Sequence, residues 1–230
     1  MQIEPVAHIR TAFRSKFGIP RQSGLVEGLL GEIVFCPTYR VAEALRGLEG
    51  YSHLWLLWDF SQAHRQDEKW SPTVRPPRLG GNRRMGVWAT RSPFRPNNIG
   101  LSSVRLVEIR LQSEEGPILI VEGADLLDGT PIFDIKPYLP FTDSHPEARG
   151  GFAEELRAKE NKLEVNFSEV QQEALTANEV AAIKQLLAAD PRPAYQDDKE
   201  RIYTMEYKNL EVKFRVEGTK AIVEKTLRKE

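Results

Sequence analysis

The sequence predicts an α+β protein with an N-terminal, mainly β, barrel-like domain and a small C-terminal mixed α/β domain. Two observations lead to this fold class. In the first part of the chain, short runs of β-branched and aromatic residues alternate with turn residues, and after about residue 141 a polar, Gly- and Pro-bearing stretch precedes a helical pattern and three further strands. A third observation, the absence of a G-x-G-x-x-G loop after any predicted strand, disfavours a doubly wound Rossmann sheet.

The first domain is predicted to be built from short strands with one helix between them. The alternation along residues 104–111 changes phase near Leu106, which predicts a bulge there. The helix is expected over residues 38–48, because Val41, Leu45 and Leu48 share one helical face. Many short strands at modest spacing favour a barrel or a sandwich. The predicted strands are residues 5–9, 32–36, 53–60, 86–90, 104–111 and 117–121.

A linker over residues 143–151 is predicted to divide the chain into domains 1–142 and 143–230. Ser168 to Gln171 has the capping-box pattern, which predicts a helix from there to about Ala189 that stops at Asp190 and Pro191. Strands are predicted over residues 163–167, 202–207, 210–216 and 220–224.

Composition excludes several classes of protein. The 230 residues carry a formal net charge of -1 and are 40% hydrophobic, which suffices for a buried core. No stretch approaches the ~20 apolar residues of a membrane span, and the N-terminus leads into polar sequence, so we expect a cytoplasmic protein without membrane association. A single cysteine, Cys36, and four scattered histidines predict neither an intrachain disulfide nor a metal site.

Charge is strongly segregated along the chain. No acidic residue occurs from Trp70 to Val107, and the positive charge of the turn-rich part of this segment, residues 75–98, comes from arginine alone. Guanidinium groups bind phosphate bidentately and stack on bases, which favours a polyphosphate or nucleic-acid ligand. Solvated loop arginines are the alternative, although the Pro and Gly residues indicate fixed loops. The arginines are Arg75, Arg78, Arg83, Arg84, Arg91, Arg95 and Arg105.

A loop over residues 125–140 carries the most chemically distinctive residues. Asp128 and Gly129 form a turn signal, so Asp128 either caps that turn or contacts a ligand. Asp134, Lys136 and Tyr138 recur at a spacing of two, which places them on one face of an extended segment. A solvated acid–lysine pair is one interpretation. A tyrosine held between prolines beside a basic segment also suits stacking on a base.

Several long motifs resemble one family. They are Pro20-Arg-Gln22, Ser52-His-Leu-Trp55, Arg75-Pro-Pro-Arg-Leu-Gly-Gly81, Ala89-Thr-Arg-Ser-Pro-Phe-Arg-Pro-Asn97, Asp128-Gly-Thr-Pro131, Asp134-Ile-Lys-Pro-Tyr-Leu-Pro140 and Asp190-Pro-Arg-Pro-Ala-Tyr195. The chain is similar to the YaeB/TsaA-like proteins of the TrmO family nearly from end to end. The resemblance implies an S-adenosylmethionine-dependent tRNA methyltransferase that methylates N6 of threonylcarbamoyladenosine beside the anticodon. It further implies a barrel methyltransferase domain, a C-terminal α/β extension and a homodimer.

The same resemblance assigns site residues. We expect the cofactor pocket to comprise Pro20, Arg21, Gln22, Ser61, Gln62, Arg91, Leu101, Asp128, Gly129, Thr130 and Pro131. The chain departs from the family at Ser61, where the family's more familiar residue is His, and at Asn98, where the family usually has Pro.

Positioning should supply most of the rate, because the lone pair of an exocyclic adenine amine is delocalised into the ring. We assign Asp134 as the acceptor of the N6 proton, Lys136 as a phosphate or carboxylate contact, and Tyr138 as a stacking or orienting group. The RNA-binding residues are expected to be Arg75, Arg78, Arg83, Arg84 and Arg95, which would contact anticodon-arm phosphates or the threonylcarbamoyl carboxylate.

Two other functions fit the residues. In a non-catalytic RNA-binding module, the arginines would bind RNA and the Pro20 and Asp128 loops would be turns only. In a small-molecule enzyme or sensor, the loops would bind an adenosyl compound and the arginines would be solvated.

Overall fold

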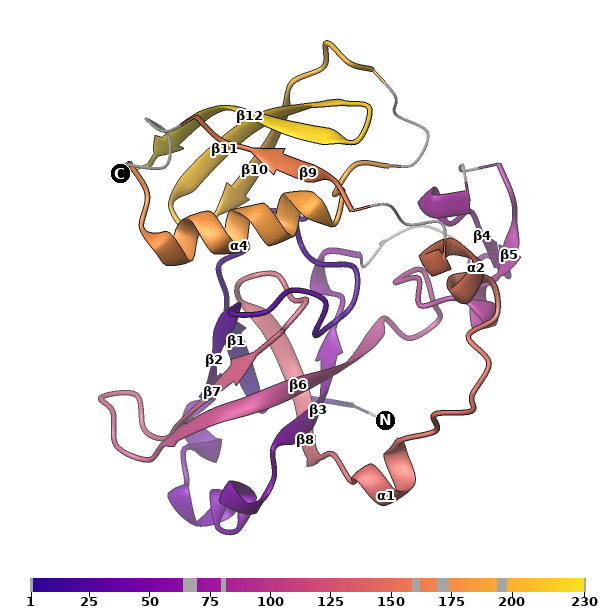
Figure 1. Cartoon of the computed structure of the whole chain (residues 1–230). Coiled ribbons are helices and arrows are strands. Elements are labelled where there is room, and N and C mark those ends of the chain that lie inside the picture. Colours follow the sequence, from indigo (N-terminus) through magenta and orange to yellow (C-terminus); the bar gives the residue numbers. More distant parts are fainter. Residues whose placement is uncertain are drawn as a thin grey trace.

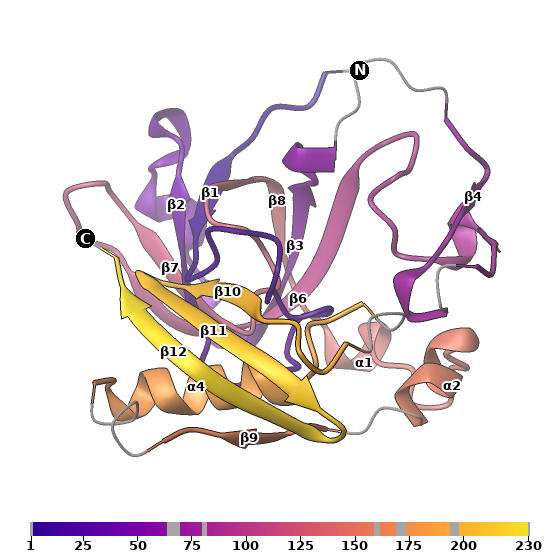
Figure 2. The ribbon, with the colours of Figure 1, turned by 90° about the horizontal axis from the view of Figure 1, so that it is seen from above.

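A computed structural model of the chain describes residues 2–63, 70–79, 82–158, 162–168, 174–193 and 198–229. In this part of the chain, a closed antiparallel barrel lies beside a second, four-stranded sheet, and α4 runs along one face of that sheet (Figures 1 and 2). The predicted α+β fold class, with a barrel in the first part and a mixed sheet in the second, is confirmed.

The barrel closes in the order β1-β2-β7-β6-β3-β8. Inward and outward residues alternate along its strands, as in β3, where Leu54, Leu56 and Trp58 are buried and the residues between them are half-buried. The predicted bulge is confirmed, because the β6–β7 register shifts between Leu106 and Glu108. The strands are β1 (Ala7–Arg10), β2 (Leu30–Phe35), β3 (His53–Asp59), β6 (Ile99–Arg110), β7 (Ile118–Glu122) and β8 (Thr130–Pro137).

Three predictions for the first domain were wrong. The helix expected over residues 38–48 is a series of 3-10 turns, η1 (Pro37–Tyr39), η2 (Ala42–Leu45) and η3 (Leu48–Gly50), since Gly47 at φ +88° breaks the helical path. The strand expected over residues 86–90 gives way after Gly86 to η6 (Val87–Ala89). The 125–140 loop contains β8, whose two prolines obscured a strand that pairs with both β1 and β3.

A small two-stranded sheet projects from the barrel beside α2 (Figures 1 and 2). It pairs β4 (Thr73–Val74) with β5 (Met85–Gly86), and η5 (Pro77–Leu79) lies in the connection between them. Fully buried Val87 anchors the sheet, and its N–H donates to the Pro72 carbonyl at 2.9 Å. The arginine-rich segment is therefore carried on a structured projection.

The second sheet has the order β10-β11-β12-β9, in which β9 is parallel to β12. The strands are β9 (Glu164–Asn166), β10 (Tyr203–Tyr207), β11 (Leu210–Glu217) and β12 (Lys220–Arg228), and the helices are α1 (Pro140–Asp143), α2 (Phe152–Ala158) and α4 (Ala177–Ala188). A continuous helix from Ser168 is contradicted, because Ala174 and Leu175 form a turn and a bend, and residues 169–173 lie outside the described chain. The observed capping box joins Thr176 to Glu179 instead.

The core of the second sheet includes residues from the beginning of the chain. Phe13, Val26 and Leu29 are buried in one cluster with α4 and strands β10 to β12. The Ala12 carbonyl accepts from the Lys208 N–H at 2.7 Å, and the Glu27 N–H donates to Gln185 Oε1 at 3.0 Å. The division at residue 142 stays a prediction, and the second core extends across it.

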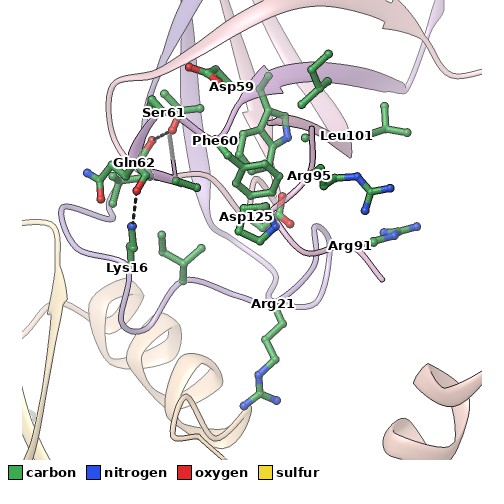
Figure 3. Close-up of a pocket in the computed structure, with 18 of the residues that line it drawn as sticks. Lys16, Arg21, Asp59, Phe60, Ser61, Gln62, Arg91, Arg95, Leu101 and Asp125 are labelled. Carbon is green, nitrogen blue, oxygen red and sulfur yellow. Dashed lines mark hydrogen bonds between the residues drawn. The ribbon is translucent and has the colours of Figure 1, made fainter. Parts of the chain in front are cut away.

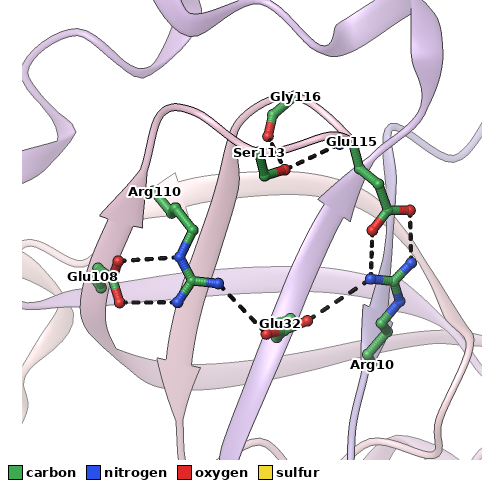
Figure 4. Close-up of polar contacts among 7 residues, drawn as sticks. All are labelled: Arg10, Glu32, Glu108, Arg110, Ser113, Glu115 and Gly116. Carbon is green, nitrogen blue, oxygen red and sulfur yellow. Dashed lines mark hydrogen bonds and ion pairs between the residues drawn. The ribbon is translucent and has the colours of Figure 1, made fainter.

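The β6–β7 hairpin is held on the outside of the barrel by exposed ion pairs (Figure 4). Arg10 donates bidentately to Glu115 at 2.6 and 2.7 Å, and Glu32 lies 3.8 Å from both Arg10 and Arg110. Arg110 also pairs with Glu108 at 3.2 Å. Solvent screens exposed pairs of this kind, so the network contributes little to stability, and none of its residues lines the pocket or the groove described next.

Candidate active site

A pocket of about 620 Å³ opens at the end of the barrel where β3 finishes and β6 begins (Figure 3). Its walls come from four stretches of chain that are far apart in sequence. They are residues 16–22, residues 58–63, residues 90–101 and residues 125–130. Of the predicted cofactor residues, the structure brings together Pro20, Arg21, Gln22, Ser61, Gln62, Arg91, Leu101 and Thr130 along this pocket.

Trp58, Ser102 and Asp125 are joined by hydrogen bonds, and we call these three residues the floor of the pocket. Sequence reasoning missed this arrangement. Trp58 Nε1 donates to Ser102 Oγ at 3.1 Å, and that hydroxyl donates to Asp125 Oδ1 at 2.6 Å. Phe60 packs on Trp58 with ring centroids 4.1 Å apart. Gly100 lies opposite Trp58 in the β3–β6 pairing and leaves room for the indole, because a Cβ there would be 2.3 Å from the ring.

Asp125 is the charged group of this floor. Burial raises the pKa of its carboxyl, and the hydrogen bond from Ser102 and the positive charge of Arg91 offset this only in part. A carboxyl whose pKa is raised in a pocket is a candidate functional group. In the sequence Asp125 lies between Glu122 and Asp128, and no local pattern singles it out.

The rim of the pocket carries the cations and the amide groups. Arg91 Nη1 donates to Gln22 Oε1, and Lys16 Nζ donates to the Gln62 carbonyl at 3.1 Å. Arg21 donates to the main-chain carbonyl of Asp190 and so ties the rim to the second domain. The site therefore offers aromatic surface, two carboxyl groups in Asp59 and Asp125, and guanidinium donors within one cavity.

Three predicted cofactor residues do not line the pocket. Asp128 is exposed, and its carboxylate accepts from the N–H of the distant Thr11 at 2.9 Å, a structural contact with the segment that follows β1. Gly129 has φ +76° and donates its N–H to the Ile9 carbonyl, and Pro131 pairs with His8 in the barrel. In this structure these residues shape the turn that delivers Thr130 to the pocket wall.

The three predicted catalytic residues also lie outside the pocket of their own chain. Asp134 and Lys136 form an exposed pair at 2.9 Å. The ring of Tyr138 lies 5.5 Å from that of Trp55, at the opposite end of β3 from the pocket. Tyr138 hydrogen-bonds to His53, about 16 Å along β3 from the level of Trp58, whereas Asp134 pairs with Leu57 near the pocket end of the strand.

The arginine-rich segment lines a second, larger groove of about 1910 Å³ between the β4–β5 projection and the second domain. Arg75, Arg84, Arg91 and Arg95 line this groove, whereas Arg83 is exposed elsewhere. Arg78 lies in η5, and its side chain is outside the described part. Arg95 is held by the carbonyls of Val87 and Thr90 at 3.1 and 2.7 Å.

Asp190, where the sequence predicts the end of a helix, contacts the first domain. Its backbone carbonyl accepts from Arg21, and its carboxylate pairs with Arg192 Nε at 2.8 Å. Residues 194–197, including Tyr195, lie outside the described chain.

In the part that the structure describes, no helix is both long and apolar enough to cross a membrane.

The fold is a closed antiparallel barrel, which is outside the Rossmann class. Its end carries an aromatic pocket with both acidic and basic groups, beside a groove rich in arginine. The family of tRNA-methyltransferase O N-terminal domains matches residues 8–144, and the TrmO C-terminal domain matches residues 160–229. The chain belongs to the TrmO family, and the predicted resemblance is confirmed.

Relatives and solved structures agree with this family. The chain is 45% identical over 223 residues to tRNA (adenine(37)-N6)-methyltransferase of Escherichia coli strain K12, covering 94% of this chain and 93% of that protein. It is 48% identical over 175 residues to the Eikenella corrodens protein of the same name, covering 76% and 96%. A crystal structure of TrmO from Pseudomonas aeruginosa superposes with a TM-score of 0.77 at 35% identity, covering 99% of this chain and 97% of that chain.

Proposed function

We propose that this protein transfers a methyl group from S-adenosylmethionine to N6 of adenine 37 of a tRNA, and that the acceptor base already carries a threonylcarbamoyl group. The sequence-based prediction of a tRNA adenine-N6-methyltransferase is confirmed as far as the names of its relatives go. The cofactor, the threonylcarbamoyl group and the anticodon arm as binding partner are parts of the proposal. Such an enzyme would act in the cytoplasm.

One observation carries the proposal. The pocket and the arginine-lined groove share a wall, so a small molecule in the pocket and a polyanion in the groove would lie against each other. The shared residues are Pro20, Arg21, Gln22, Ala63, Thr90, Arg91, Pro93, Phe94 and Arg95. A simple RNA-binding module would have no need of the pocket, and a small-molecule sensor would have no need of the groove.

The pocket residues fit S-adenosylmethionine by their chemistry. Trp58 and Phe60 supply flat apolar surface for an adenine, Asp59 and Asp125 supply acceptors for the ammonium and sulfonium charges, and Arg91 supplies donors for a carboxylate. When bound, the cofactor supplies an activated methyl group. The task left to the chain is to hold the N6 amine in line and to accept its proton.

The proton acceptor predicted from the sequence, Asp134, does not line the pocket of its own chain. None of Asp134, Lys136 and Tyr138 lines the pocket of its own chain, and we propose that a second copy of the protein brings them to the base, so the homodimer is part of the proposal. Asp125 orients groups at the pocket floor, where its carboxyl is fixed by Ser102.

Radiolabelled methyl transfer tests the function directly. Purified protein is incubated with labelled S-adenosylmethionine and tRNA that either carries or lacks the threonylcarbamoyl group. We expect incorporation only into the modified tRNA, and equal incorporation into both would remove that group from the proposal. A melting temperature unchanged by S-adenosylmethionine would favour the RNA-binding module, since a ligand that binds only the folded state raises its stability. Flat tRNA affinity across a salt titration would favour the small-molecule sensor.

A further inference from the structure

Two exposed tryptophans form an aromatic pair on the wall of the groove. Trp70 and Trp88 have 50% and 66% of their surface exposed, and their ring centroids lie 6.2 Å apart at an interplanar angle of 32°. Phe94, which is 44% exposed, lines the same groove. Neither tryptophan contributes to a hydrophobic core among the described residues, so packing of the fold does not explain the pair.

The β4–β5 pairing builds this pair. Thr73 lies opposite Gly86, so the residues just before β4 and just after β5 come together, and these include Trp70 and Trp88. Burial of Val87 turns the side chain of its neighbour Trp88 outward. Arg95 lies over the Trp88 ring, with its guanidinium carbon 5.0 Å from the centroid, and its contacts with two carbonyls hold it there. The ring is therefore presented on a fixed support.

The surroundings of the pair are strongly basic on both sides of the groove. The opposite wall belongs to the second domain and includes Arg157 of α2 and Lys162. Among the described lining residues, Asp190 is the only acid, and Arg192 already pairs with it. The basic residues of the groove are Arg21, Arg75, Arg84, Arg91, Arg95, Arg157, Lys162 and Arg192.

We propose that Trp70 and Trp88 are a stacking platform for unpaired bases of the tRNA anticodon loop, and that the basic residues on both walls hold the backbone of that loop. The inference rests on the proposed function and adds residues and a binding mode to it. Single-stranded nucleic acid is held by this combination of stacked aromatic rings and a basic track. The platform adjoins the shared wall, so a loop bound there would present the next base to the pocket.

Charge argues for RNA instead of a second copy of the chain on this surface. A two-fold contact through the groove would set one arginine-rich wall against its own copy, and like charges facing each other disfavour association. The cores of protein interfaces are also depleted in charged residues. A polyanion satisfies the cations, and its unpaired bases cover the tryptophans.

The test measures binding of a synthetic anticodon stem-loop RNA to the full chain across a salt titration. Trp88→Ala and Trp70→Ala should each weaken binding about tenfold at every salt concentration, with an unchanged slope of log affinity against log salt. Arg84→Gln should reduce that slope by about 0.7, because it removes one phosphate contact. Trp88→Phe should restore most of the affinity. Tyr39→Ala, at an exposed aromatic on η1 that lines neither cavity, is the matched control and should bind as the wild type does.

A fully paired, blunt-ended RNA duplex of the same length separates stacking from charge. It should bind more weakly than the stem-loop and equally to the wild type and to Trp88→Ala, because it offers no unstacked base. If both tryptophan variants bind the stem-loop as tightly as the wild type does, the stacking platform is refuted. The proposed methyltransferase function is not affected by that result. A change in oligomeric state in Trp88→Ala, seen by sedimentation without loss of RNA affinity, would overturn it in favour of a contact between copies. Failure of the wild type to bind or to methylate tRNA would instead refute the proposed function.

Discussion

Gly100→Ala should damage the floor of the pocket through a single added methyl group. A Cβ at this position would lie 2.3 Å from one ring carbon of Trp58 and 2.5 Å from another, so the indole has to move. It has little room, because Trp58 is only 7% exposed, packs on Phe60 and donates to Ser102. Displacing it also removes the hydrogen bond that orients Ser102 toward Asp125.

The expected size follows from two effects. Overpacking a tight site costs about 1–3 kcal/mol, and loss of the buried indole hydrogen bond costs about 1 kcal/mol more. The free energy of unfolding should therefore fall by about 2–4 kcal/mol. Affinity for S-adenosylmethionine should fall at least about tenfold, because the fixed carboxyl at the pocket floor is lost.

Urea denaturation followed by circular dichroism measures the first effect, and titration calorimetry with S-adenosylmethionine measures the second. Gly50→Ala is the control, since Gly50 has no positive φ and a Cβ there would meet nothing within 4 Å. Its stability should stay within about 0.5 kcal/mol of the wild type. A Gly100→Ala protein that matches this control in both measurements refutes the account of the pocket floor. Lost stability with unchanged cofactor affinity would refute only the role of Asp125.

Three further predictions concern the two domains. Asp125→Asn should weaken S-adenosylmethionine binding about 10- to 100-fold by calorimetry. The free energy of unfolding at neutral pH should stay equal or rise, because burial raises the pKa of this carboxyl and its negative charge disfavours the folded state above that pKa. A clear loss of stability in Asp125→Asn would contradict this. Burial opposes ionisation of Glu179, but hydrogen bonds from Arg228 and Thr176 outweigh it and lower its pKa. Glu179→Gln should cost about 1–2 kcal/mol at pH 7, and the difference from wild type should shrink as the pH falls below 4.5, as urea melts at several pH values would show. Phe13→Ala should cost about 3–5 kcal/mol in the same melts, because its ring is 1% exposed within the second core; a loss below about 1 kcal/mol would contradict the shared core.

The sequence was most informative where local pattern and tertiary structure agree. The alternation of Leu54, Leu56 and Trp58 follows from burial on one side of a strand, and so it could be recognised without a structure. Residues 38–48 misled because their apolar spacing also fits successive tight turns, and Gly47 decides between the two. β8 was missed because proline near both ends resembles a loop. Each proline lies where β8 pairs with one neighbour only, Pro131 with β1 and Pro137 with β3.

The pocket was partly predictable for a different reason. Pro20 to Gln22 and Arg91 were carried by motifs, whereas nothing in the local pattern distinguishes Asp125 from its acidic neighbours Glu122 and Asp128. Its importance comes from Ser102 and Trp58, which are brought to it by strand pairing over 23 and more residues. The aromatic pair was missed likewise, because nothing in the linear order shows that Trp70 and Trp88 meet. Asp134, Lys136 and Tyr138 keep their predicted roles only as hypotheses about an assembled dimer.

Because residues from 12 to 29 pack into the second core, the two domains cannot be separated by a single cut of the chain. Cutting the chain at the linker would expose Phe13, Val26 and Leu29 as an apolar patch on the barrel. Neither half therefore has a complete hydrophobic core of its own. Gly18, at φ +97°, lies so close to Met205 that a Cβ would approach its side chain to 2.4 Å, and Gly18 stands between Lys16 and Ile19, which both line the pocket. The second domain thus packs directly against the segment that supplies Pro20 and Gln22 to the pocket wall, so its β10 strand is part of the support of the pocket.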